Sequence, residues 1–234
     1  MAYNGETTNG LSCLLNKRHV LDLWQPRGKS RDIKKTMNLT RRQQAILVGT
    51  LLGDACLQKT GEKNARLRLE QGEKQKEYLF WKTKQFPKLF NKAPGYIERT
   101  HPKTKKTYAY WRAQSHSSPV LGSWHTLFYK DGAKYFPKDL AELLTLPLSL
   151  AVWYMDDGYY SLKERHSFIY LGRVSRSEAE IAKEAIKINF NLLPRVYDKK
   201  QKGFALFFSV AETKKLHKLI ESEMIDSMTY KLAP

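Results

Sequence analysis

The sequence predicts an α+β fold built from two similar halves. Each half is predicted to contain a helix, strands, a second helix, further strands and a third helix, so the same order occurs twice. The segments LVGTLLGDA (47–55) and LAVWYMDDG (150–158) superpose without a gap, which places Asp54 and Asp157 at equivalent positions. A period of about 100 residues is much too long for a solenoid repeat and indicates an internal duplication.

The first half is predicted to begin with a helix, because Thr40 and Gln43 form a capping-box pattern ahead of the apolar residues 45–52. The segments 65–70 and 105–115 alternate between apolar and polar residues, which predicts two half-buried strands. Further helices are expected at 73–86 and after Ser118, the predicted N-cap that precedes a proline.

In the second half, residues 145–157 are predicted to form a helix capped by Thr145, followed by a strand at 167–175. Ser177 and Glu180 are expected to form the capping box of the next helix. A hairpin turning at Lys-Gln-Lys-Gly and a final helix complete the chain. The predicted organisation is a basic N-terminal arm (1–38), a first repeat (39–144) and a second repeat (145–234).

Charge and cysteine content restrict the class of protein. Lysine and arginine total 41 against 23 acidic residues, giving a net charge of +18, which favours a polyanionic partner, above all nucleic acid. No apolar run approaches the ~20 residues of a membrane-spanning helix. The two cysteines are too few for a disulfide framework or a cysteine zinc site. They suit a reducing compartment, either an organelle or a prokaryotic cytoplasm.

Two aspartates, Asp54 and Asp157, end the apolar segments, where the partial negative charge of a helix C-terminus disfavours a carboxylate. Gly49 and Gly53 lie on one helical face and would allow a neighbouring backbone to come close. If the two apolar helices pack side by side, the carboxylates meet and form a focus of negative charge. Oxygen ligands suit magnesium, which can promote hydrolysis of a phosphodiester.

Each half also contains a lysine before x-x-Pro, at KYFP (134–137) and KLAP (231–234). Taken singly, these short patterns are more typical of helix ends and close packing than of an active site. The gapless repeat, the two lysines and the net charge together favour a metal-dependent nuclease. None of the histidines has the spacing of metal ligands, and none is assigned to metal.

The two acidic segments resemble the paired motifs of a single-chain LAGLIDADG homing endonuclease, and the resemblance covers residues 39–234. It implies two αββαββα repeats related by a pseudo-twofold axis, with saddle-shaped antiparallel sheets over double-stranded DNA. It also implies a monomer that cuts both strands with Mg²⁺ or another divalent cation such as Mn²⁺. Asp54 and Asp157 would be metal-binding catalytic acids, and Lys134 and Lys231 would flank the two active centres.

The sequence departs from the family motif at two positions. Ala55 replaces the usual glycine, and Val152 occupies the place of a packing glycine. Both changes are expected to alter helix spacing more than activity. Asp156 is expected to play a structural role rather than to bind metal directly.

The strand alternation assigns polar side chains to a DNA-reading face, although such side chains can also simply be solvated. The candidates in the first half are Arg66, Arg68, Glu70, Lys106, Tyr108, Tyr110, Arg112 and Gln114, and those in the second half are Arg173, Arg195 and Tyr197. The segment FALFFSV offers few such groups. The first half is therefore expected to discriminate more strongly among bases.

Two other functions fit the same fold: an intron RNA maturase and a DNA-binding regulator that does not cleave. The presence of both acids favours cleavage over a maturase without nuclease activity. A regulator would be expected to carry an added helix-turn-helix segment. An intein is disfavoured, because Met1 and Ala233-Pro234 do not match splice-junction residues.

Overall fold

The computed structural model describes residues 38–234, so the predicted basic arm lies outside the described residues except for Asn38. The predicted α+β fold with two αββαββα units is confirmed. The elements of the first unit are α2 (Arg41–Leu52), β1 (Cys56–Lys59), β2 (Ala65–Gly72), α3 (Lys76–Gln85), β3 (Gly95–Thr100), β4 (Thr107–Gln114) and α4 (Pro119–Phe128).

A short connection made of β5 (Tyr129–Lys130), β6 (Ala133–Lys134) and α5 (Leu140–Leu143) leads to the second unit. The elements of that unit are α6 (Pro147–Asp157), β7 (Gly158–Tyr160), β8 (Ser167–Gly172), α7 (Arg176–Phe190), β9 (Arg195–Asp198), β10 (Phe204–Phe208) and α8 (Val210–Ile220). Single turns of 3₁₀-helix occur at Glu73–Gln75, Lys200–Lys202 and Glu221–Glu223, and a longer one at Asp226–Lys231 carries Lys231.

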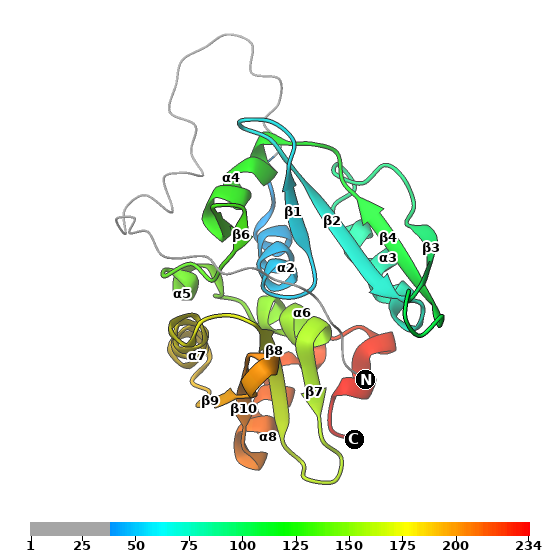
Figure 1. Cartoon of the computed structure of the whole chain (residues 1–234). Helices are drawn as coiled ribbons and strands as arrows, with labels where there is room; N and C mark the ends of the chain where they lie inside the picture. Colours follow the sequence, from blue (N-terminus) through cyan, green and yellow to red (C-terminus); the bar gives the residue numbers. More distant parts are fainter. Residues whose placement is uncertain (1–37) are drawn as a thin grey trace.

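Each unit forms one four-stranded antiparallel sheet, with the equivalent strand orders β1-β2-β4-β3 and β7-β8-β10-β9. Figure 1 shows α2 and α6 together at the centre of the molecule, with the first sheet above them and the second below. The strands β1 and β7 follow directly from these central helices. The fold therefore connects the end of each central helix to one edge of a sheet.

The central helices are buried along most of their length, as expected for segments that are apolar on every side. Their close approach depends on the glycines of α2. A Cβ atom on Gly49 would overlap the carbonyl oxygen of Ser149 and the side chain of Val152, and one on Gly53 would overlap Asp156. The side-by-side packing of the two helices matches the sequence prediction, and Val152 fills the space that Gly49 leaves.

We expect Gly49→Ala to lower the free energy of unfolding by about 1–3 kcal/mol, because an added methyl group overpacks a tight interface. Alanine favours a helix over glycine by about 1 kcal/mol, so a loss would show that packing dominates. Gly61→Ala is the matched control, since a Cβ there meets nothing within 4 Å. Urea unfolding of both variants measures the difference, and an unchanged or stabilised Gly49→Ala would contradict the close approach.

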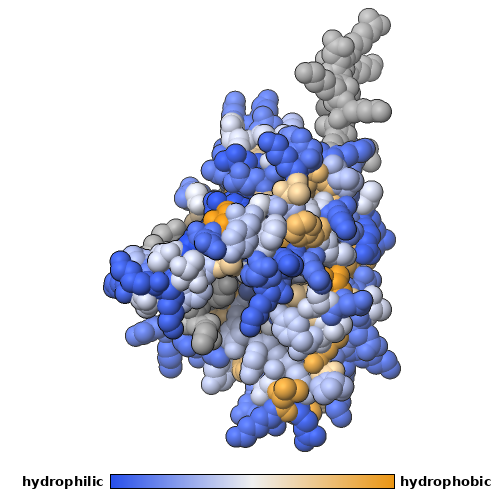
Figure 2. Space-filling model, turned by 90° about the vertical axis from the view of Figure 1, so that its right-hand side faces the viewer, coloured by the Kyte–Doolittle hydropathy of each residue, from blue (hydrophilic) through white to orange (hydrophobic). Residues whose placement is uncertain are grey.

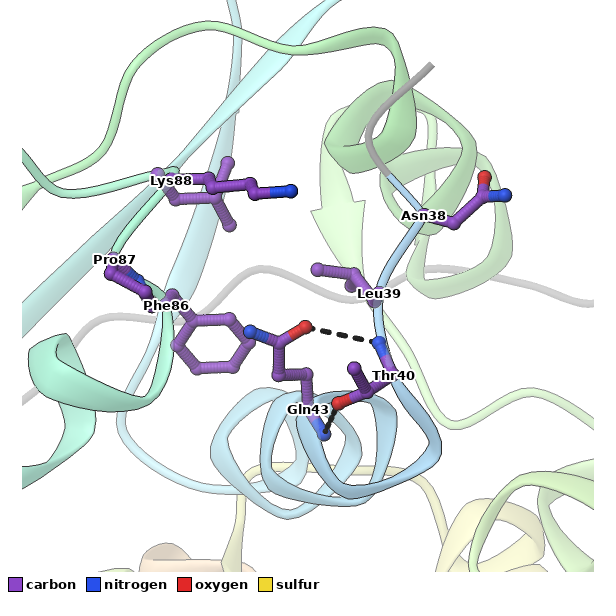
Figure 3. A pocket seen from close by; sticks show the side chains of 8 residues that line it. Asn38, Leu39, Thr40, Gln43, Phe86, Pro87 and Lys88 are labelled. Atoms are coloured by element: carbon purple, nitrogen blue, oxygen red, sulfur yellow. Dashed lines mark hydrogen bonds between the residues drawn. The ribbon is translucent and has the colours of Figure 1, made fainter. Parts of the chain in front are cut away.

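The capping box predicted for α2 is present. Thr40 Oγ1 accepts a hydrogen bond from the Gln43 backbone N–H (3.2 Å), and Gln43 Oε1 accepts one from the Thr40 N–H (3.0 Å; Figure 3). A small pocket beside this cap is bounded by Phe86 and Lys88 on the opposite side. Because α2 has 12 residues and is thus about 18 Å long, the pocket lies far from the end that leads to Asp54.

Two predicted caps were wrong. Helix α6 begins at Pro147 with Leu146 as its N-cap, and no side chain bonds there, because proline itself presets the first helical turn. Helix α7 is capped by Ser175 with Glu178, two residues before the predicted pair of Ser177 and Glu180. The two S-x-x-E patterns overlap in the sequence, and the structure uses the earlier one.

Two predicted strand positions were also wrong. Strand β4 begins at Thr107, so Lys106 lies in the preceding turn, where its carbonyl accepts a hydrogen bond from the His101 N–H. Strand β8 ends at Gly172, whose positive φ of 68° turns the chain, and Arg173 lies beyond it. Both residues are adjacent to the sheets rather than part of them.

Figure 2 shows a face of the molecule on which hydrophilic residues dominate and apolar residues form small separate patches. Among residues 38–234, no helix combines the length and the apolar character needed to span a membrane.

Candidate active site

The residues predicted to perform chemistry come together at the C-terminal ends of α2 and α6. Asp54 follows α2 after Gly53, and Asp157 is the last residue of α6. Their mutual repulsion contributes to the raised pKa of Asp157. The duplicated motif therefore supplies one acid from each half to a common centre.

The two predicted lysines bind the ends of the central helices. Lys134 Nζ donates to the carbonyl oxygens of Gly53 (2.7 Å) and Ala55 (3.2 Å), on either side of Asp54. Lys231 Nζ donates to those of Met155 (2.6 Å) and Asp156 (2.9 Å), just before Asp157. Each lysine thus satisfies helix-terminal carbonyls of its own half and offsets the negative end of the helix.

The electrostatics of the centre follow from burial. Burial raises the pKa of Asp157 well above its usual range, and repulsion from Asp54 and Asp156 raises it further, whereas Lys134 and Lys231 lower it. Burial lowers the pKa of Lys134 and of Lys231, although the aspartates oppose this change. Repulsion between the Asp54 and Asp157 carboxylates would be relieved by a cation bound between them.

Asp156 is engaged by the protein itself. Its carboxylate forms a salt bridge of 2.6 Å with Lys82, and the two side chains are 0% and 1% exposed. Burial raises the pKa of Asp156 to about 6, even though Lys82 lowers it. Gln71 Nε2 donates to Asp156 Oδ1 (3.1 Å) and to Asp54 Oδ2 (3.2 Å), and so links the ends of the two central helices.

Sequence reasoning did not identify Lys82 or Gln71. The alternation of β2 contained a signal for Gln71, because it places this polar side chain on the same buried face as Leu67 and Leu69. A polar residue on a buried strand face needs a polar partner. Lys82 gave a weaker signal as a lysine within the apolar run of α3, and only the structure reveals its pairing with Asp156.

The donor set fits a hard divalent cation. Asp54 and Asp157 offer carboxylate oxygens, and Asp54 is exposed. Within the part of the chain that the structure describes, no group of three or more His, Cys, Asp or Glu residues could hold a metal ion. Two carboxylates with water and phosphate oxygens are a common environment for Mg²⁺, which keeps several of its waters, whereas zinc prefers nitrogen and sulfur ligands.

The first sheet carries predicted DNA-contacting side chains on the face opposite Leu67 and Leu69. On that face Glu70 is the centre of an ion-pair network, accepting two hydrogen bonds from Arg99 (2.6 and 2.8 Å) and others from Arg112. Although burial raises the pKa of Glu70, the bonds to these arginines lower it below the usual value. The arginines are therefore held in place by an ionised carboxylate.

The other predicted residues of the first sheet surround this network. Arg68 lies 3.6 Å from Glu70, and Arg66 donates to Gln58 (2.9 Å). Tyr108 and Gln114 are exposed on β4, and Arg99 stacks over the ring of Tyr110 at 5.1 Å. In the second sheet, Arg195 and Tyr197 are exposed on β9. Their contact with DNA remains a prediction.

His217 is linked by hydrogen bonds to the backbone on both sides of Leu232, next to Lys231. Its Nε2 lies 3.0 Å from the Tyr154 hydroxyl, which in turn donates to the Lys231 carbonyl oxygen. Its Nδ1 accepts a hydrogen bond from the Ala233 N–H (2.9 Å), so Nε2 carries the proton of the neutral ring. Burial lowers the pKa of His217 to about 4.

This lowered pKa predicts a loss of stability in acid. The unfolded chain binds a proton at His217 near pH 6.5, whereas the folded chain resists it until about pH 4, so the contribution is complete above pH 6.5 and is lost as the pH falls toward 4. We expect the loss to reach about 3 kcal/mol. The free energy of unfolding is measured for the wild type and for His217→Gln between pH 8 and pH 4. The difference between the two proteins at each pH isolates the contribution of His217, because the other titrating groups are common to both. A constant difference would contradict the assignment.

Comparison with known proteins agrees with this geometry. The model of the LAGLIDADG DNA endonuclease family matches residues 44–216. The chain belongs to this family. The match includes both acidic motifs and confirms the resemblance inferred from them.

Individual relatives of this LAGLIDADG protein cover most of its length. A "Probable intron-encoded endonuclease 1" of Wickerhamomyces canadensis is 26% identical over 225 residues, covering 94% of this chain and 96% of that protein. The protein RecA of Mycobacterium shimoidei is 30% identical over 214 residues. That match covers 84% of this chain and 47% of RecA, so the chain spans about half the length of this relative.

The fold is also shared with a solved structure. The homing endonuclease I-WcaI bound to its DNA recognition sequence matches with a TM-score of 0.79 at 23% identity, covering 95% of this chain and 96% of that one. Both repeats therefore have counterparts in a LAGLIDADG fold.

Proposed function

We propose that this LAGLIDADG endonuclease makes double-strand breaks in a long asymmetric DNA target by divalent-metal-dependent hydrolysis of phosphodiester bonds. The observation that carries the proposal is the meeting of Asp54 and Asp157 at the seam between the repeats, with a lysine at each helix end. The formal charge of +18 supports an extended contact with the phosphate backbone.

Asp54 and Asp157 are the residues that would hold the metal. When bound there, Mg²⁺ would supply Lewis-acid stabilisation of the phosphodiester and a more acidic water. The chain's own contribution is positional. Gln71 orients the Asp54 carboxylate, and the lysines place positive charge beside the phosphates in a partly buried setting, where charge interactions are stronger than in water.

We further propose that residues 39–144 and 145–234 act as the two repeats of a monomer. A dimer of identical subunits would require a nearly symmetric site, whereas here the two sheets present different side chains. The half-sites should therefore differ in sequence. Light scattering of the complex measures the stoichiometry, and two chains per duplex would contradict the proposal.

The direct test is cleavage of a randomised duplex library with Mg²⁺, followed by sequencing of the cut ends. We expect the cut ends to define one non-palindromic sequence in the presence of Mg²⁺. No cut ends are expected when EDTA replaces Mg²⁺. Cleavage that persists in EDTA would overturn the metal dependence. Binding without cleavage under all metal conditions would favour the non-cleaving regulator, and preferential binding of structured intron RNA would favour the maturase.

The lysines allow a more specific prediction. Lys134→Met and Lys231→Met are each expected to slow cleavage about 100-fold, because each removes a preorganised charge that acts on the transition state. Binding should change far less. Lys138→Met, which removes an exposed lysine four residues after Lys134, is the matched control. Single-turnover rates and affinities measured in Ca²⁺ separate the two effects, and an affinity loss equal to the rate loss would contradict a role in chemistry.

A further inference from the structure

The second sheet carries a cluster of aromatic side chains on the face opposite its core. We call this the ring face and define it by Tyr159, Phe168, Tyr170, Tyr197 and Phe207. The alternate residues of β8, among them Ile169, are buried against the helices. The three tyrosines are 49%, 37% and 52% exposed in chain order, and the two phenylalanines between them are half-buried, so the rings form a surface and not a second core.

Strand register builds this surface in rows. Phe168 pairs with Tyr159 on β7 and with Phe207 on β10, and Phe207 pairs with Arg195 on β9, so one row crosses all four strands. The Phe168 and Phe207 ring centroids are 5.2 Å apart. In the neighbouring row Ala205 pairs with Tyr170 on β8 and with Tyr197 on β9.

The equivalent face of the first sheet has a different chemistry. There a row pairs Arg68 with Cys56 and Gln114, and the next pairs Glu70 with Arg112. These side chains are hydrogen-bond donors and acceptors suited to base edges. At the corresponding level of the second sheet the row consists of three rings and one arginine, so the two halves cannot read bases in the same way.

The ring face continues from the active centre. Strand β7 begins at Gly158, immediately after Asp157, and carries Tyr159. Two cations lie over the rings: Lys199 Nζ is 4.8 Å from the centroid of Phe168, and the Arg195 guanidinium is 5.0 Å from that of Phe207. A DNA duplex held at the acids would pass over this aromatic surface and the two cations that lie against it.

We propose that the ring face reads thymine methyl groups in the major groove of one half-site. The C5 methyl of thymine is an apolar feature on a base edge that phenylalanine can contact. The phenylalanine rings have no hydrogen-bonding group, so they cannot select a base through donors or acceptors. They can select it by excluding water from a methyl group, which accounts for an aromatic surface where the other half has arginines.

The inference rests on the proposed function, and the experiment separates the two. The duplex recovered from the randomised library is resynthesised with deoxyuridine in place of thymidine in one half-site at a time. Deoxyuridine lacks only the methyl group and keeps all hydrogen-bonding groups of the base. Arg112→Ala assigns the half-sites, because it changes base preferences in the half under the first sheet.

In the half-site under the ring face, each contacted methyl group that is removed is expected to lower affinity about fourfold. Phe207→Thr should lose most of this sensitivity, because the ring that contacts the methyl group is gone. Tyr197→Thr is a second variant on the edge strand β9 that disturbs the sheet less. Tyr96→Thr, at an exposed tyrosine on the edge strand β3 of the first sheet, is the matched control and should keep the sensitivity in full.

Equal affinity for uracil and thymine under the ring face would overturn this inference, as would a recovered half-site without thymine. The first measurement uses the unaltered protein and does not depend on a variant folding correctly. If no duplex in the library is bound, the proposed function fails and this inference fails with it. If the duplex is cleaved equally well with deoxyuridine and with thymidine under the ring face, only this inference is overturned and the proposed function stands.

Discussion

Replacing Asp54 or Asp157 with Asn is expected to abolish double-strand cleavage while the protein still folds and binds DNA. The amide has nearly the same shape as the carboxylate but removes the negative charge on which a divalent cation depends. Loss of a metal ligand and of the transition-state stabilisation that it supports should reduce the rate by at least about 1,000-fold. This is the largest effect on activity that the structure predicts.

The two variants should differ in stability. Asp157 is partly buried beside two other carboxylates, and burial together with their repulsion raises its pKa, so neutralising it should stabilise the fold at neutral pH. Asp54 is exposed, so Asp54→Asn should change stability little. If Asp157→Asn is inactive but has a higher free energy of unfolding than the wild type, the Asp157 carboxylate costs stability and serves activity.

The measurement combines cleavage of a supercoiled plasmid that carries the target with gel-shift affinity in Ca²⁺. Asp131→Asn is the matched control, since Asp131 is an exposed turn residue of the β5–β6 hairpin with no assigned role at the active centre. It should cut at the wild-type rate. Full double-strand cutting by Asp54→Asn or by Asp157→Asn would contradict the assignment of the replaced aspartate as a metal-binding catalytic acid.

The architecture could be predicted from sequence because duplication made each signal appear twice. One GDA or one MDDG is an ordinary helix end, but their gapless superposition predicts that Asp54 and Asp157 lie at equivalent positions of a common centre. Gly49 and Gly53 predicted close packing for a local reason, the missing Cβ, and the structure places Ser149, Val152 and Asp156 against them. Local geometry and duplication both point to the same seam.

The network behind the acids could not be predicted in the same way. Lys82 meets Asp156 across 74 positions of sequence, and no local pattern links the two residues. The ring face was missed for a different reason. An all-apolar strand such as SFIYLG is typical of burial on both faces, so period-two alternation does not reveal that Phe168 and Tyr170 point away from the core.

The salt bridge between Lys82 and Asp156 gives the largest expected effect on stability. Its side chains are 1% and 0% exposed, and Lys82 Nζ lies 2.6 and 2.9 Å from the two carboxylate oxygens. Lys82→Met keeps the length of the side chain and leaves Asp156 without its cation. Removing one partner of a buried pair costs about 3–5 kcal/mol. By comparison, Lys187→Met, at a pair with Glu184 whose side chains are about half exposed, should cost less than about 1 kcal/mol.

The pH dependence and a double substitution distinguish loss of the ion pair from a packing defect. Without Lys82, the folded-state pKa of Asp156 rises further above the unfolded value. Stability is then retained in acid, where the carboxyl is protonated, and is lost as the pH rises through the folded-state pKa. The cost of Lys82→Met should therefore be larger at pH 8 than at pH 5. Lys82→Met with Asp156→Asn should recover much of the loss, because no charge stays buried. Urea unfolding in EDTA at both pH values tests this, and a cost independent of pH without recovery in the double variant would show that packing alone is responsible.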